Sequence, residues 1–189
     1  MKNIAIFASG SGSNAQNIVE YFSLHPDIRV TLILSNKADA FVLERAGKLG
    51  IPSVVFTRRD FYESEIVLET LRKSQIEFIV LAGFLWFVPE NILKAYPHKI
   101  VNIHPALLPK YGGKGMYGDK VHQAVIQAGD SSTGITIHYV NEHYDEGEII
   151  FQESFEIQPE DTAESIAKKV HQLEYKHFPW IIEKVIKLS

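Results

Sequence analysis

The first predicted strand and the loop that follows it decide the fold class of this chain. They read Ile4-Ala5-Ile6-Phe7-Ala8-Ser9-Gly10-Ser11-Gly12-Ser13-Asn14-Ala15. Ile4–Ala8 is a short apolar run typical of a buried strand, and the pattern over Asn14–Phe22 is helical. A strand that passes through a glycine loop into a helix predicts the first half of a βαβ unit.

The same alternation continues along the chain and predicts a mostly parallel sheet. Further strands are expected at Val30–Ser35, Ser53–Phe56, Phe78–Ala82 and Val101–His104, and helices at Phe41–Leu49, Phe61–Ser74 and Val121–Ala128. Strands as apolar as Phe78–Ala82 suit a parallel sheet that is covered on both faces. The end of the chain predicts a β-pair, Gly134–Val140 with Glu148–Ile157, and a long amphipathic helix, Thr162–Ile186, with a break near Pro179.

We therefore predict an α/β, Rossmann-like fold. Its mostly parallel central sheet carries helices on both faces, and the C-terminal β-pair and long helix complete it. The chain has no repeat, low-complexity tract or linker, which predicts a single domain over residues 1–189.

Composition narrows the possible functions. The chain has 189 residues, of which 46% are hydrophobic, and this is enough for one buried core. It contains no cysteine, which excludes disulfides, thiolate nucleophiles and cysteine-based zinc sites. The net charge is −4 without any basic run, and no apolar run approaches the ~20 residues of a membrane span. We expect a cytoplasmic protein without nucleic-acid or membrane partners.

The glycine loop Gly10–Asn14 is a candidate anion site. Glycines let the backbone approach a phosphate, and the N-terminus of the following helix supplies N–H donors. The loop could hold a phosphate ester, bind a dinucleotide, or form only a structural turn with a helix cap. A dinucleotide site needs an acidic residue at the end of the second strand, where this chain has Ser35-Asn36-Lys37. A phosphate ester is therefore the favoured interpretation.

Asn102 and His104 lie at the end of a strand, in Val101-Asn102-Ile103-His104-Pro105. The period of two points both side chains to the same face, and the proline stops the strand just after them. An amide and an imidazole held side by side can polarise a carbonyl and move a proton.

Asp145 is the candidate partner of this pair. It lies in the predicted turn Tyr144–Gly147, and a carboxylate that reached His104 would raise the pKa of the imidazole. The alternative is an ordinary solvated turn residue. His122 opens a predicted helix and is expected to serve packing.

Two other chemistries are disfavoured. A metal site would use His138, His143, Asp145 and Glu148, whose spacing matches no recognised ligand pattern. A serine hydrolase would need a G-x-S-x-G motif, which the sequence lacks.

The segments Asn102-x-His104-Pro105-x-Leu107-Leu108-Pro109 and Asp145-x-Gly147 carry a family resemblance. With them, the chain resembles the folate-dependent formyltransferases, and among these the phosphoribosylglycinamide formyltransferases, from Asn3 to about Ile186. The resemblance implies the formyltransferase fold and transfer of the formyl group of 10-formyltetrahydrofolate to the amine of phosphoribosylglycinamide in de novo purine (IMP) biosynthesis. Direct attack would be assisted by Asn102, His104 and Asp145. No metal would take part, and the enzyme would be a monomer or homodimer.

The resemblance also implies the binding residues. Those expected to bind phosphoribosylglycinamide are Gly10, Ser11, Gly12, Ser13, Asn14, His171, Gln172, Leu173 and Glu174. Those expected to bind the folate are Arg59, Leu85, Trp86, Phe87, Val88, Asn102, Asn141, Glu142, His143, Tyr144 and Asp145.

Two features depart from the family pattern. Trp86 stands where many members have arginine, and the glycine-rich loop Gly112–Asp119 is longer than in the best-known relatives. The loop could be a lid or a tolerated insertion. Three other functions stay open from the residues alone: formyl transfer or hydrolysis with another acceptor, a nicotinamide-dependent oxidoreductase, and a phosphate-binding module without enzymatic activity.

Overall fold

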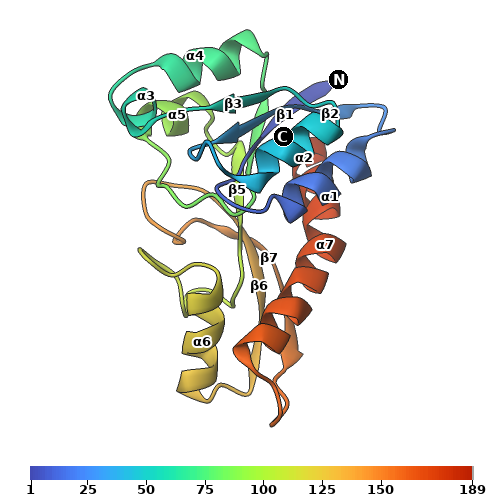
Figure 1. The fold of residues 1–189 in the computed structure, drawn as a ribbon, viewed down its shortest axis with the longest axis vertical. Coiled ribbons are helices and arrows are strands. Elements are labelled where there is room, and N and C mark those ends of the chain that lie inside the picture. The colour runs from blue at the N-terminus through green and yellow to red at the C-terminus, as the bar shows by residue number, and fades with distance from the viewer. Residues whose placement is uncertain (189) are drawn as a thin grey trace.

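A computed structural model describes residues 1–188 and contains one seven-stranded sheet with helices on both faces (Figure 1). The strands are β1 (Lys2–Phe7), β2 (Ile28–Ser35), β3 (Ser53–Val55), β4 (Phe78–Leu81), β5 (Ile100–His104), β6 (Ser132–Tyr139) and β7 (Ile149–Glu156). The helices are α1 (Ser13–Phe22), α2 (Phe41–Lys48), α3 (Arg58–Tyr62), α4 (Ile66–Lys73), α5 (Glu90–Ala95), α6 (Asp119–Ala128) and α7 (Ala163–Leu188). This architecture confirms the predicted fold class.

The sheet order is β3-β2-β1-β4-β5-β6-β7. The first five strands run parallel, and β6 and β7 add as an antiparallel pair beside β5. The chain runs outward from β1 to β3 and then returns to place β4 on the other side of β1. In open α/β sheets, such a reversal leaves a crevice at the carboxyl ends of the strands, where ligands bind.

Alternate residues of the central strands pack into two hydrophobic cores, one on each face of the sheet. Ile4 and Ile6 of β1 pack in one cluster with buried residues of α1, α2 and α7. Ala5 and Phe7 pack in the other cluster with residues of α3, α4 and α5. Burial on both faces explains why these strands are continuously apolar. Within residues 1–188, no helix combines the length and apolar character needed to cross a membrane.

The predicted helix Phe61–Ser74 is wrong in its extent, because the structure has two helices there. Thr57 and Asp60 form a capping box that starts α3 earlier than expected. Ser64 then interrupts the helix: its hydroxyl donates to the Asp60 carbonyl and accepts from the N–H of Ile66. Such local side-chain bonds compete with the helical pattern that the apolar spacing suggests.

The predicted break at Pro179 is also wrong, because α7 continues through that residue. A proline inside a helix leaves the carbonyl four residues earlier without its N–H donor. Here that carbonyl belongs to Tyr175, and it accepts a hydrogen bond of 2.9 Å from the side-chain amide of Asn17 on α1. A neighbouring helix thus supplies the donor that the proline lacks.

Removal of this donor is expected to destabilise the protein in a way that depends on the proline. Asn17→Ala should lower the free energy of unfolding by about 1 kcal/mol, the usual net value of one hydrogen bond. In a Pro179→Ala background the same change should cost less, because the restored N–H can donate to the Tyr175 carbonyl. Urea unfolding of the four proteins measures the coupling. Equal costs of Asn17→Ala in both backgrounds would contradict this account.

Candidate active site

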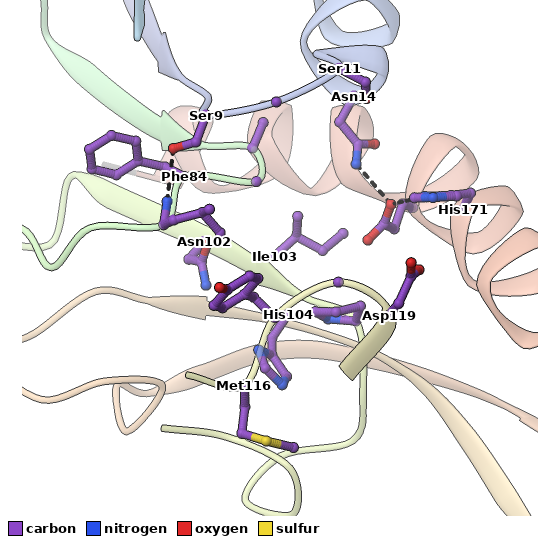
Figure 2. A pocket seen from close by; sticks show the side chains of 18 of the residues that line it. Ser9, Ser11, Asn14, Phe84, Asn102, Ile103, His104, Met116, Asp119 and His171 are labelled. Atoms are coloured by element: carbon purple, nitrogen blue, oxygen red, sulfur yellow. Dashed lines mark hydrogen bonds and ion pairs between the residues drawn. The ribbon is translucent and has the colours of Figure 1, made fainter. Parts of the chain in front are cut away.

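A cavity of about 390 Å³ lies at the reversal of strand order (Figure 2). Its wall on one side is the glycine loop between β1 and α1. The cavity is also lined by the ends of β4 and β5, by α7 beside the glycine loop, and by the loop before α6 and the start of α6. The site therefore lies where the sheet topology places ligands in α/β folds.

Ser9 joins the strand ends at this point. Its N–H donates to the Gly83 carbonyl beyond β4 at 3.1 Å. Its hydroxyl donates to the side-chain oxygen of Asn36 beyond β2 at 2.7 Å and accepts from the N–H of Leu85 at 3.0 Å. Ser9 is 3% exposed, so these bonds form in a buried environment. One side chain thus connects the loops that follow β1, β2 and β4.

The glycine loop packs against α2. Gly12 has φ of +73°, and a Cβ atom there would lie 2.4 Å from the Cγ2 atom of Val42, so no larger residue fits. The Gly10 carbonyl accepts from the N–H of Val42 at 3.1 Å, and the Ser11 carbonyl accepts from Nε of Arg45 at 2.8 Å. The Gly10 and Ser11 carbonyls thus accept hydrogen bonds from α2 and not from groups in the cavity. The loop leads directly into the N-terminus of α1. An anion is favoured there.

Glu174 connects this loop to α7. It is 4% exposed, and its Oε2 atom accepts from the side-chain amide of Asn14 at 2.8 Å and from Nδ1 of His171 at 2.8 Å (Figure 2). The hydrogen bond to Glu174 raises the pKa of His171. The predicted ribonucleotide residues on the loop and on α7 are therefore brought together, except for two. Gln172 is exposed and Leu173 packs against the core, so neither lines the cavity.

Asn102 and His104 lie side by side at the end of β5, as their spacing predicts (Figure 2). His104 is 3% exposed, and its Nε2–H donates to the Tyr111 carbonyl at 2.8 Å. Its Nδ1 atom lies 3.6 Å from Oδ2 of Asp145. Asp145 has φ of +56°, and the same oxygen accepts from the N–H of Gly113 at 2.9 Å. The three predicted catalytic residues thus form one cluster.

The cluster includes a fourth member, His138, which the sequence analysis placed only in the disfavoured metal site. Its Nδ1–H donates to the Tyr139 carbonyl at 2.8 Å, which leaves Nε2 to accept from the side-chain amide of Asn102 at 3.1 Å. That Nε2 atom also lies 3.6 Å from Oδ1 of Asp145. His138 pairs with Asn102 across β5 and β6, a register that sequence alone does not reveal.

Asp145 raises the pKa of His104 as expected, but the net shift of this pKa is downward. Burial lowers the pKa of His104, and this exceeds the opposing effect of Asp145 and of the Tyr111 carbonyl. Burial alone would raise the pKa of Asp145. The nearby His138 and His104 rings and the hydrogen bond from the Gly113 N–H together bring that pKa below its usual value. The resting pair is therefore a neutral imidazole beside a carboxylate.

An apolar extension adjoins the cluster on the far side of Asn102. A smaller cavity of about 60 Å³ is lined there by Trp86, Phe87, His143 and Tyr144, together with Asn102, His138 and Asp145. Phe87 and Tyr144 have ring centroids 5.0 Å apart. Flat aromatic walls of this kind suit a planar heterocycle. Leu85 lines the main cavity instead.

Several predicted folate residues lie outside both cavities. Val88 belongs to the core, Asn141 accepts within its own turn from the N–H of His143, and Glu142 is exposed. Arg58 and Arg59 are both exposed, but the Cζ atom of Arg58 lies 5.9 Å from the Trp86 ring centre and 5.1 Å from that of Tyr62. The arginine close to the apolar wall is thus Arg58.

The structure adds cavity residues that sequence reasoning did not assign. Among them are Met116, Tyr117, Asp119 and His122, contributed by the glycine-rich loop and the start of α6. His122 was expected to serve packing; it is 3% exposed and lines the cavity. In the described part of the chain, residues 1–188, no group of three or more His, Asp or Glu side chains is arranged to hold a metal ion.

Comparison with known proteins agrees with this site. The model of the formyl transferase family matches residues 2–182. The chain therefore belongs to the formyl transferase family.

Within this family, the chain is similar to proteins named phosphoribosylglycinamide formyltransferase. A phosphoribosylglycinamide formyltransferase of Bacillus subtilis is 39% identical over the whole chain and 97% of its own length. The chloroplastic phosphoribosylglycinamide formyltransferase of Arabidopsis thaliana is 41% identical over 96% of the chain, which spans 64% of that relative. The crystal structure of the enzyme of that name from Bacillus halodurans superposes with a TM-score of 0.88 at 37% identity, over 98% of this chain and 95% of that one.

Loss of the Asp145 charge is expected to lower the pKa of His104 further. Asp145→Asn removes the main opposing effect and leaves the burial that already depresses this pKa. An NMR titration of the His104 ring measures the change, and Glu146→Gln, on the exposed neighbour, serves as the control. An unchanged or raised pKa of His104 in Asp145→Asn would contradict the electrostatic description of the cluster.

Proposed function

We propose that this protein transfers the formyl group of 10-formyltetrahydrofolate to the amine of phosphoribosylglycinamide, a step of de novo purine synthesis. One observation carries the proposal. A phosphate-type loop and the Asn102–His104–Asp145 cluster line one cavity, and an aromatic pocket adjoins it through the shared residues Asn102, Tyr144 and Asp145. Family membership supports the chemistry, and the names of the relatives support the acceptor. The proposed setting is the cytoplasm.

The two substrates would occupy opposite ends of the crevice. The phosphate of the ribonucleotide would bind the N–H groups of Gly10–Asn14 at the start of α1, and its ribose would reach Glu174. The pterin would lie against Trp86, Phe87 and Tyr144 in the apolar extension. The amine and the formyl carbon then meet at the end of β5. Holding both in one site supplies a large part of the rate by proximity.

The cluster at the end of β5 would then move one proton and stabilise one charge. The amine lone pair attacks the formyl carbon, and the carbonyl electrons move onto the formyl oxygen. A side-chain N–H of Asn102 donates to that oxyanion. Nδ1 of His104 accepts the proton of the attacking amine, directly or through water, and Asp145 stabilises the resulting imidazolium.

Collapse of the tetrahedral intermediate completes the reaction and frees the folate. The oxyanion collapses to restore the carbonyl, the bond from the formyl carbon to N10 breaks, and N10 receives the proton from His104. No covalent bond to the enzyme forms. The neutral resting state of His104 suits this sequence, because a base must be unprotonated before it accepts a proton.

Release of folate from a 10-formyl folate, followed by absorbance, tests the proposed reaction. We expect release only when phosphoribosylglycinamide is present. Release without it would indicate a hydrolase, and release only with another amine would indicate a different acceptor. Stabilisation by nicotinamide nucleotides in place of phosphate esters would favour the oxidoreductase.

Substitution of the histidine tests the role of the cluster. His104→Ala should reduce kcat about 10²–10⁴-fold, the usual contribution of a positioned acid–base group. The melting temperature and the KM of both substrates serve as controls for folding and binding. Turnover of His104→Ala close to that of the wild type would contradict the mechanism.

A further inference from the structure

Tyr111 contacts the reaction centre through its backbone. Its carbonyl accepts the Nε2–H of His104 at 2.8 Å, and it does so from a left-handed conformation with φ of +57°. A residue with a Cβ atom pays roughly 1–2 kcal/mol for this conformation. The direction of the carbonyl depends on the backbone angles, so whatever holds Tyr111 in place also holds the bond to His104.

The Tyr111 side chain is anchored outside the cavity. Its ring packs against the core, and its hydroxyl donates to Oδ2 of Asp130 at 2.8 Å. Asp130 follows Gly129, whose φ of +67° ends α6, and precedes β6. The aspartate is thus placed by two regular elements. Nζ of Lys110 lies 3.1 Å and 3.2 Å from its two carboxylate oxygens.

The anchor determines which nitrogen of His104 carries the proton. A carbonyl only accepts, so the bond to Tyr111 requires a proton on Nε2. A neutral ring then has its lone pair on Nδ1, which lies 3.6 Å from Oδ2 of Asp145, and His104 is one of the residues that line the cavity. Without the Tyr111 carbonyl, the carboxylate would favour the opposite tautomer with the proton on Nδ1. That tautomer cannot accept a proton on the cavity side.

We propose that Asp130 and the Tyr111 hydroxyl are positioning residues, which hold the Tyr111 carbonyl on Nε2 of His104 and keep Nδ1 free to accept a proton. The proposal rests on the formyl transfer proposed above. Neither residue lines the main cavity or its aromatic extension, and both act through the backbone of Tyr111. The chain of contacts runs from Asp130 at the end of α6, through Tyr111, to the catalytic cluster.

Four variants separate this role from a merely structural one. Tyr111→Phe removes the hydroxyl and keeps the ring and the carbonyl, and Asp130→Ala removes the acceptor. Asp130→Asn is the conservative variant, because its amide oxygen can still accept from the phenol. Lys110→Ala is the matched control. It removes the other partner of Asp130, on a side chain that is 68% exposed, and leaves the bond to Tyr111 intact.

Two measurements are made on the full chain. Steady-state kinetics give kcat and KM for both substrates, and ¹⁵N NMR of the histidine rings gives the tautomer of His104. We expect Tyr111→Phe and Asp130→Ala to lower kcat about tenfold, on the scale of one lost hydrogen bond, with little change in either KM. The proton of His104 should move from Nε2 toward Nδ1 in both. Asp130→Asn and Lys110→Ala should stay close to the wild type in both measurements.

Two results would overturn the proposal. One is a kcat within twofold of the wild type for Tyr111→Phe and Asp130→Ala. The other is a loss of kcat while His104 keeps its proton on Nε2, which would mean that the anchor only stabilises the loop. The NMR measurement needs no substrate. A failure of the proposed reaction in the wild type would therefore leave the tautomer test decisive on its own.

Discussion

The hydrogen bonds of Ser9 are the interaction on which the rest of the site depends. The sheet order reverses between β1 and β4, and the loops beyond these strands would diverge without a connection. The Ser9 hydroxyl bridges Asn36 beyond β2 and Leu85 beyond β4, and its N–H bonds Gly83. The glycine loop and the segment that leads into the aromatic pocket are thus fixed relative to each other by one buried side chain.

The reaction centre is a buried polar network in which each group orients the next. Tyr139 holds His138, His138 holds Asn102, and Tyr111 holds His104. Burial makes an incomplete network costly, because an unpaired polar group loses its water without replacement. The same burial lowers the pKa of His104, so that the imidazole begins as a base and its charged form depends on Asp145. Both the stability of the fold and the proposed chemistry therefore require that these buried side chains keep their hydrogen-bond partners.

Local patterns predict the fold and a part of the site. The glycine loop after an apolar strand predicts a βα unit with an anion site, and the period of two in β5 places Asn102 beside His104. Local details that such patterns do not capture also limit the accuracy of the prediction. Ser64 divides a helix whose apolar spacing is continuous, and the two arginines on α3 differ in position by only one residue.

The remainder depends on contacts between distant segments. His138 enters the cluster through the pairing register of β5 and β6. Asn17 on α1 supplies the donor that lets α7 pass Pro179, and Asp130 reaches Tyr111 because α6 ends beside it. His122 lines the cavity because of where the glycine-rich loop leads into α6. Each of these relations is set by packing in three dimensions, and no spacing along the chain encodes it.

The kinetics of Ser9→Ala test most directly the claim that one crevice positions both substrates. Loss of the hydroxyl should loosen the glycine loop and the Leu85 segment together. We predict that KM rises about fivefold for both the ribonucleotide and the folate, which corresponds to the net free energy of about one hydrogen bond. A KM change confined to one substrate, or absent for both, would contradict the account.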